Sequence, residues 1–126
     1  MKIVAEIQKT DKIFLELDET VAPKTVNQLI KKLPFKVGLN IWGDEIYTDP
    51  TPIKMGKENA KSVVDLFDVA YWHPGNAICL FYGPTPLSTT QIKPYSPVNV
   101  IGKIKNPDKT ILSRIVAGTK ATFREA

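Results

Sequence analysis

Apolar and polar residues alternate along several short segments of this chain, the pattern of β-strands that bury one face. Residues 12–17 read KIFLEL, so that every second residue from position 13 is Ile or Leu. Residues 2–7 have a similar apolar content. The two segments predict a hairpin, with a turn at residues 9–12.

The period changes between residues 22 and 33, APKTVNQLIKKL. The apolar residues there are three or four positions apart, which places them on one face of a helix: Val26, Leu29, Ile30 and Leu33. Pro23 suits the first helical turn, where a missing N–H costs nothing. Pro34 ends the helix, because proline also restricts the residue before it. Such a helix must cover an apolar surface.

The remaining pattern predicts more strands and one further short element. Strands are expected within residues 35–48 (two, with a turn between them), 63–64, 69–72, 77–82, 98–104 and 121–124, with a short helix or turn at 108–116. Residues 49–62 contain prolines, a glycine and polar residues, which indicates an excursion over the surface. Residues 83–97 predict a long proline-rich loop, a kind that is often functional or packed over a core.

Composition limits the classes that need to be considered. At 126 residues and 43% hydrophobic content, the chain suits one domain spanning residues 1–126, without repeats or linkers. The net charge of +4 comes from dispersed lysines, whereas nucleic-acid binders concentrate basic residues on one face. We therefore expect no nucleic-acid partner. The oligomeric state does not follow from the sequence.

Targeting and metal signals are also weak. No apolar run approaches the roughly 20 residues of a membrane span, and no signal sequence is evident, so we expect no membrane association and a cytoplasmic location. Cys79 stands alone in an apolar run and is expected to be a small buried hydrophobe. No His/Cys/Asp spacing suits a metal, and no cofactor is expected.

Several motifs occur in an order that resembles the cyclophilins. APKTVN (22–27) resembles the motif that opens their first helix, VIGKI (100–104) resembles one of their strands, and residues 81–86 resemble their aromatic strand and its loop. The similarity is greater to a family of small uncharacterised archaeal and bacterial cyclophilin-like proteins. Its hallmarks match GDEIY (43–47), ENA (58–60), DVAYW-PGNA-C-F-GPTP (68–86) and SPVNVIGKI (96–104).

This resemblance covers nearly the whole chain and has consequences for the fold. It implies a mainly β fold: a closed eight-stranded cyclophilin-like β-barrel with one or two short capping helices. One departure is Phe67, where the closer family favours a glycine. This alters the turn locally and leaves the fold assignment unchanged.

The resemblance does not extend to the catalytic group of prolyl isomerases. Cyclophilins use an arginine on the strand after the first helix, and the matching stretch here, FKVGLN (35–40), has none. Lys36 is nearby, but an ammonium cannot reproduce the planar fork of a guanidinium. The two arginines, Arg114 and Arg124, lie near the end of the sequence. The sequence therefore predicts that the scaffold is kept and the isomerase chemistry is lost.

The resemblance also places a substrate groove over the strands near residues 35–47 and 70–82. Its candidate residues are aromatic, acidic or amide side chains: Trp42, Glu45, Tyr47, Tyr71, Trp72, Asn76 and Phe81. Neighbouring strand residues point to opposite faces, so about half of the aromatic side chains must face the core. Barrel packing remains an equal alternative for them, and a turn-stabilising role remains one for Asn76.

Two further residues could carry acid–base chemistry. Glu45 follows Asp44 in an aromatic setting, and a carboxylate desolvated by aromatic rings has a raised pKa and can act as a general base. A simple polar turn is the alternative. His73, the single histidine, stands at the start of the Pro-Gly-Asn turn and is expected to be exposed.

Taken together, the sequence predicts a barrel that binds a small molecule or a short peptide in its groove. No catalytic residue is assigned. The alternatives are a prolyl isomerase of weak or atypical activity, a hydrolase-like enzyme that uses Glu45 or His73, and a protein-interaction module that uses strand edges or the loop 83–97.

Overall fold

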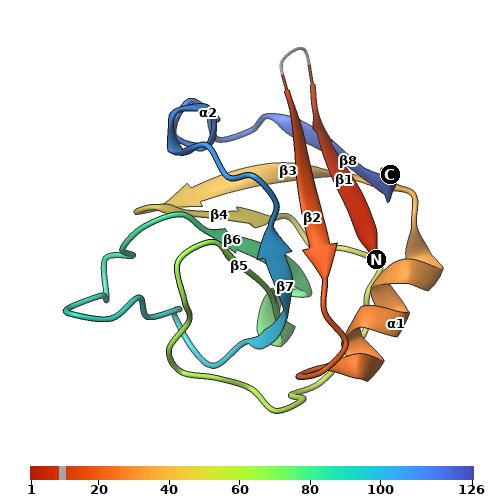
Figure 1. Ribbon diagram of the computed structural model, residues 1–126, viewed down its shortest axis with the longest axis horizontal. Helices are drawn as coiled ribbons and strands as arrows, with labels where there is room; N and C mark the ends of the chain where they lie inside the picture. Colours follow the sequence, from red (N-terminus) through yellow and green to blue (C-terminus); the bar gives the residue numbers. More distant parts are fainter. Residues whose placement is uncertain (9–10) are drawn as a thin grey trace.

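The computed structural model describes residues 1–8 and 11–126, which form a closed antiparallel barrel of eight strands (Figure 1). The strand order around the barrel is β1-β2-β7-β5-β6-β4-β3-β8. The strands are β1 (Lys2–Ile7), β2 (Lys12–Leu17), β3 (Phe35–Trp42), β4 (Glu45–Thr48), β5 (Asp68–Trp72), β6 (Ala77–Phe81), β7 (Asn99–Ile104) and β8 (Lys120–Glu125). The predicted fold class, a mainly β closed barrel with short helices, is confirmed.

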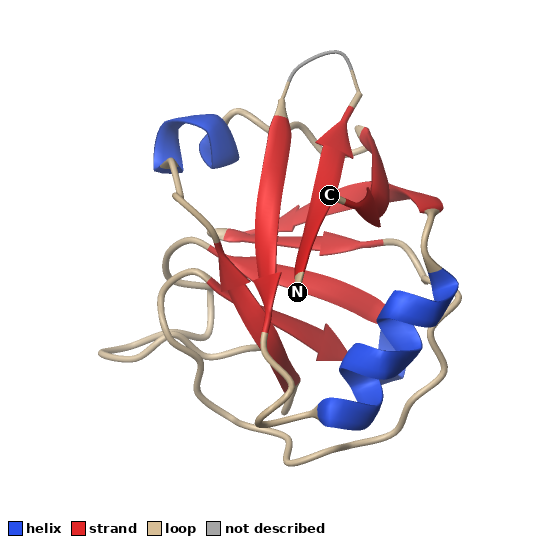
Figure 2. Cartoon of the chain, turned by 45° about the vertical axis from the view of Figure 1, so that its right-hand side comes forward, coloured by secondary structure: helices blue, strands red, loops and turns tan. Residues whose placement is uncertain are grey.

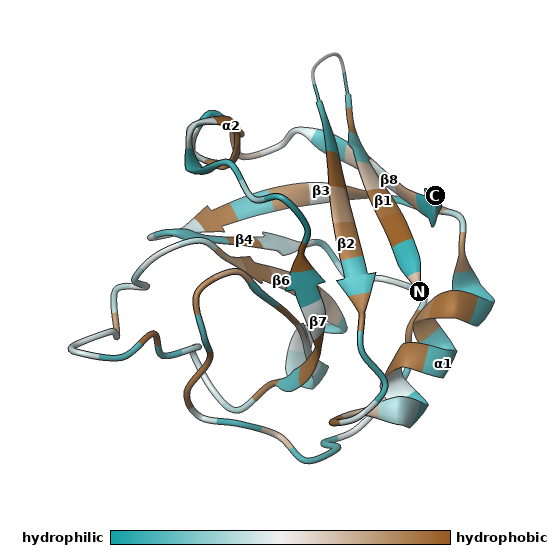
Figure 3. Cartoon of the chain, in the orientation of Figure 1, coloured by the Kyte–Doolittle hydropathy of each residue, from teal (hydrophilic) through white to brown (hydrophobic). Residues whose placement is uncertain are grey.

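Alternating side chains fill the barrel interior, as the sequence pattern predicted. In β2 the burial alternates residue by residue, with Ile13, Leu15 and Leu17 inside. Every strand contributes to one apolar cluster, and Figure 3 shows the apolar residues distributed along the strands and on helix α1 (Pro23–Lys32). The predicted turn at residues 9–12 includes Lys9 and Thr10, which lie outside the described residues.

Two helices lie on opposite sides of the barrel (Figure 2). Helix α1 begins at Pro23 and buries Val26 and Leu29 in the main core, as its apolar stripe predicted. Helix α2 (Lys109–Ser113) is short and is capped by Asp108, whose carboxylate accepts hydrogen bonds from the N–H groups of Thr110 and Ile111. Such a cap satisfies backbone donors that a helix start leaves free.

Two sequence expectations need correction. The segment 49–62 is not simply an excursion over the surface, because Thr51 and Ile53 are buried and Ile53 belongs to the main core. Residues 63–64 do not form a strand. Val64 makes only an isolated bridge to Ile92, which anchors one loop to another.

A second, smaller apolar cluster lies on the outer face of the barrel. It comprises Val64, Ala70, Cys79, Phe81 and Val98. Strand residues that point away from the interior form its base. The loop segments containing Val64 and Ile92 pack over them, held by the Val64–Ile92 bridge and by a bridge between Lys61 and Val98. This layer positions the site described next.

Candidate functional site

A cavity of about 180 Å³ opens on the outer face of the barrel beside the second cluster. Its walls come from four strands and from the segment that leads into β7. They are mostly aromatic or apolar, with one carboxylate: Trp42, Glu45, Tyr47, Trp72, Cys79, Pro94, Tyr95 and Val98.

Strand alternation and register bring the wall of the cavity together. Trp42 at the end of β3 pairs with Glu45 at the start of β4, and Tyr47 pairs with Cys79 on β6. Glu45 and Tyr47 are two residues apart and therefore share a face. Residues from separate segments thus form one continuous surface because of the barrel pairing.

The loop 83–97 supplies the other side of the cavity, where Pro94 and Tyr95 lie. Thr85 is buried, and its hydroxyl donates a hydrogen bond to the carbonyl of Lys93. The hydroxyl of Ser88 accepts hydrogen bonds from the N–H groups of Thr85 and Lys93, at 2.9 and 3.1 Å. These bonds close the loop and fix the chain directly before Pro94.

Three aromatic rings meet at the cavity. The Tyr95 ring stands edge-on to Trp42 and to Trp72, with both centroid separations 5.9 Å, the geometry that aromatic quadrupoles favour. Tyr95 itself is 67% exposed. An exposed ring held between two tryptophans borders the cavity where it meets solvent.

The position of Trp72 is fixed by its neighbours. Its indole Nε1–H donates a hydrogen bond of 2.7 Å to the hydroxyl of Ser96. The ring also packs against Gly75, where an added Cβ would lie 2.7 Å from a ring carbon. The glycine of the Pro-Gly-Asn turn is therefore required by the close approach of this indole.

Glu45 is the charged group of the cavity. It is only 6% exposed, and its Oε1 has no hydrogen-bond partner among the described residues. Burial raises the pKa of Glu45 to about 7, and the Cys79 thiol opposes this by hydrogen bonding. Burial and the nearby Glu45 raise the pKa of Cys79 well above its usual range. The adjacent Asp44 carboxylate lies instead against Gly83, so the two acids do not act as a pair.

The structure places four of the seven candidate groove residues at the cavity: Trp42, Glu45, Tyr47 and Trp72. Tyr71 is fully buried in the main core, with its hydroxyl 3.0 Å from the carbonyl of Ile53 and 3.0 Å from Asn76 Oδ1. Asn76 adopts a left-handed conformation at the turn, and Phe81 is fully buried in the second cluster. These three residues do not line the cavity.

Four lining residues were not among the candidates: Cys79, Pro94, Tyr95 and Val98. From its sequence context alone, Cys79 is expected only to pack as a small buried hydrophobe. The length and proline content of the loop 83–97 marked it as notable, but no pattern in the sequence links Tyr95 to Trp42 and Trp72.

Other chemical groups lie away from the cavity. Arg124 pairs with Glu6 on β1 at 2.9 Å, and Arg114 ends helix α2. His73 begins a 3₁₀ turn and is partly buried. Within residues 1–8 and 11–126, no group of three or more His, Cys, Asp or Glu side chains is arranged to hold a metal. In the same residues, no helix is both long and apolar enough to cross a membrane.

The fold and site define a class of protein: a closed eight-stranded antiparallel barrel with a small aromatic cavity on its outer face. The family model described as "Cyclophilin-like" matches residues 1–124. The chain belongs to this cyclophilin-like family. The resemblance seen in the sequence motifs is thereby confirmed.

Two solved structures are similar to this chain. A hypothetical protein from Archaeoglobus fulgidus, AF2241, has 42% identity and a TM-score of 0.84, over 100% of this chain and 95% of its own. McbB, solved in complex with tryptophan, has 15% identity and a TM-score of 0.74, over 98% of this chain and 44% of its own. The second similarity concerns the fold alone. Among curated proteins, no sequence matches.

Proposed function

We propose that this protein binds a small molecule, or one residue of a short peptide, in the cavity between strands β3–β6 and the loop 83–97. The observation that supports this most is a concave aromatic site with a buried carboxylate oxygen that has no hydrogen-bond partner among residues 1–8 and 11–126. Ligand sites combine apolar walls with a few polar groups in this way. A buried polar atom without a partner costs free energy, which a ligand donor would recover.

The volume limits the size of the ligand. At about 180 Å³, the cavity is smaller than the roughly 300–1,000 Å³ of sites for drug-sized ligands. It suits a metabolite of few atoms or a single side chain. McbB, whose structure contains tryptophan, shares this fold over 44% of its own chain, and the low identity transfers no site to this chain.

Tryptophan fluorescence tests the proposal directly. The chain has two tryptophans, and both line the cavity. A thermal-shift screen of metabolites and short peptides should yield ligands that also change the tryptophan emission. The proposal would be contradicted if the hits do not change the tryptophan emission of the original protein and also stabilise the Tyr95→Leu variant equally well. Such ligands would bind elsewhere on the protein.

A second candidate function is acid–base catalysis on the bound molecule. A pKa of about 7 for Glu45 suits a general base near neutral pH. With a ligand that the protein turns over, Glu45→Gln should abolish turnover even at ligand concentrations that saturate the variant. The expected cytoplasmic location remains a prediction, which cell fractionation would test.

A further inference from the structure

The cavity combines two features that favour the same ligand charge. One is the cluster of electron-rich rings formed by Trp42, Trp72 and Tyr95. Cations are attracted to the faces of aromatic rings, with tryptophan the strongest. The other is the Glu45 carboxyl group, which lies in the same lining.

Within residues 1–8 and 11–126, Glu45 has no cationic partner. Only 6% of its surface is exposed, and its Oε1 lacks a hydrogen-bond partner in the described part of the chain. Its ionised form is stabilised by the Cys79 thiol alone. A buried carboxylate is costly unless it is paired with a cation. A cationic ligand would supply this missing partner for Glu45.

The charge of the lining is otherwise neutral. Its other ionisable groups are the Cys79 thiol of β6 and the phenols of Tyr47 on β4 and Tyr95 in the loop, and none of its residues is Lys, Arg or His. The protein carries a net charge of +4, yet none of the basic side chains that the structure describes lines this cavity. An anionic ligand would meet Glu45 without compensation.

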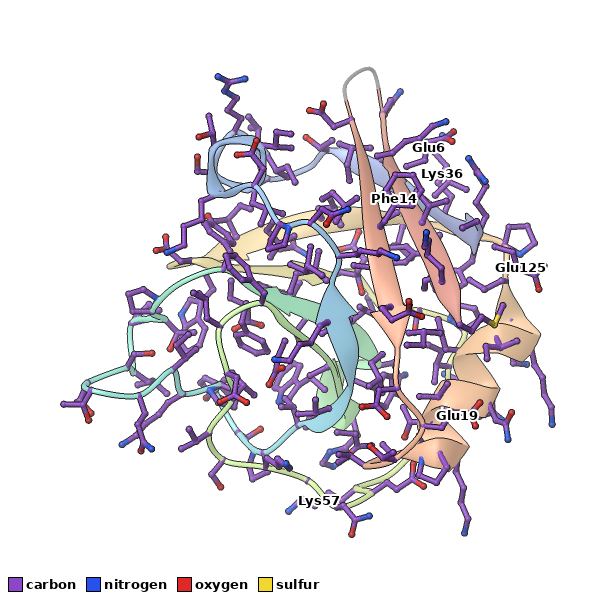
Figure 4. The ribbon with its side chains drawn as sticks, viewed as in Figure 1. Glu6, Phe14, Glu19, Lys36, Lys57 and Glu125 are labelled. Carbon is purple, nitrogen blue, oxygen red and sulfur yellow. The ribbon has the colours of Figure 1, made fainter. Side chains whose placement is uncertain are left out.

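Figure 4 shows several charged side chains that lie elsewhere. Glu6 lies on β1, Lys36 on β3, Glu19 near α1, and Lys57 on the loop between β4 and β5. The cavity brings together one carboxylate, several aromatic rings and a volume of about 180 Å³.

From these features we infer that the ligand is a compact organic cation: an alkylammonium group held by the Glu45 carboxylate and the rings of Trp42, Trp72 and Tyr95. This inference rests on the proposed function, since it names the ligand class of the same cavity. The volume of about 180 Å³ restricts the cation to a small head group.

Three probes with nearly the same shape test the charge. Choline carries a trimethylammonium group, 3,3-dimethylbutan-1-ol replaces its nitrogen with carbon, and 3,3-dimethylbutanoate carries a negative charge. Each is titrated into the intact protein at about pH 8, where a carboxyl group of pKa about 7 is mostly ionised. Tryptophan fluorescence gives the affinity, and calorimetry confirms it.

The expected order is choline, then the neutral alcohol, then the anion. Choline should bind about tenfold more tightly than the alcohol, from the combined effect of the rings and the carboxylate. Equal or tighter binding of the alcohol or the anion would overturn the inference. This comparison uses the unaltered protein, so no variant needs to fold.

Variants then locate the effect. Glu45→Gln should weaken choline binding about tenfold and leave the alcohol unchanged, while the matched surface change Glu19→Gln should alter neither. Tyr95→Leu, at a residue 67% exposed, should also weaken choline more than the alcohol. A Glu45→Gln variant that folds and binds choline as before would exclude the ion pair.

The failure of this inference is distinguishable from failure of the proposed function. If choline does not bind but a neutral or anionic metabolite from the screen changes the tryptophan emission, the cavity binds ligands and the cation assignment is wrong. If no compound of any charge changes the emission or the melting temperature, both proposals fail.

Discussion

The buried Glu45 makes the stability of the folded protein depend on pH. Its folded-state pKa of about 7 exceeds its ordinary value of 4.5 because burial disfavours the charge. Between these two values the folded state binds more protons than the unfolded state, so the free energy of unfolding falls as pH rises. Stability from this residue is full below about pH 4.5 and is lost as pH passes through about 7.

Glu45→Gln should therefore flatten the pH dependence. Relative to the variant, the original protein should lose on the order of 2–3 kcal/mol between about pH 4.5 and 8. Denaturant unfolding at several pH values measures this difference. Glu19→Gln retains Glu45 and should keep the original slope. A Glu45→Gln variant with the same slope as the original protein would assign the pH dependence to another group.

Phe67 has a backbone conformation that is unfavourable for a residue with a side chain. Its φ is +69°, a left-handed conformation that costs roughly 1–2 kcal/mol for residues other than glycine. Its N–H donates to the carbonyl of Phe81, and its carbonyl accepts from the N–H of Ile104, so the surrounding sheet fixes this conformation. Glycine, which the resemblance leads us to expect here, would adopt this conformation without that cost, whereas the ring of Phe67 packs partly against the core.

Two substitutions separate these effects. Phe67→Ala removes the ring and keeps the backbone cost, whereas Phe67→Gly removes both, so the glycine variant should be more stable by about 1 kcal/mol. Chemical denaturation compares the two. At Phe14, an exposed position within β2, the order should reverse, because glycine weakens an extended strand. An alanine variant that is the more stable one at both positions would contradict the argument.

At the scale of elements, the loop 83–97 is the part of the site not built on strands. The hydroxyls of Thr85 and Ser88 hold it closed. Thr85→Val keeps the shape and removes the bond to the Lys93 carbonyl, which should cost about 1–3 kcal/mol and loosen the chain before Pro94.

Tryptophan emission and amide hydrogen exchange measure that loosening. After Thr85→Val, emission should shift because Tyr95 moves relative to Trp42 and Trp72, and exchange should quicken in residues 85–96. Thr90→Val, at an exposed position of the same loop, serves as the control. Unchanged emission and exchange after Thr85→Val would mean that the Ser88 hydrogen bonds and the Val64–Ile92 bridge hold the loop without the Thr85 hydroxyl.

Strands and helices have a periodic sequence pattern and the loop 83–97 has none, which explains which parts of the site the sequence could predict. The helix stripe correctly placed Val26 and Leu29 in the core. The family resemblance, rather than alternation, suggested Glu45 and Tyr47 as groove residues, and both line the cavity. Alternation could not decide whether Tyr71 or Trp72 faces the interior, because both are apolar enough for either face. The contact of Tyr95 with the tryptophans depends on loop closure by Thr85, which has no periodic signature.

At the scale of the whole molecule, closure of the barrel places the main hydrophobic core and the cavity on opposite sides of the sheet. Each of the eight described strands is paired on both sides over at least part of its length, so none of them is an edge strand that a partner could extend along its whole length. The core lies inside the barrel and the cavity outside it. Substitutions at the cavity should therefore change binding with little effect on the main core.

This separation also bears on prolyl isomerisation. Its uncatalysed barrier is about 18–20 kcal/mol, and only groups that bind the twisted state better than the ground state lower it. No arginine lines the cavity, and Arg124 is already paired with Glu6. Lys36 is six residues from Trp42 along β3, which corresponds to about 20 Å of extended strand.

We therefore predict no acceleration of prolyl isomerisation in a standard proline-peptide assay with the intact protein. Lys36→Arg should not create activity, because a guanidinium at that end of β3 cannot reach the cavity. An isomerase rate in the usual cyclophilin range that also falls after Tyr95→Leu would contradict this. It would mean that the aromatic rings and Glu45 stabilise the twisted prolyl bond without a guanidinium, and the cavity would then be an active site for proline peptides.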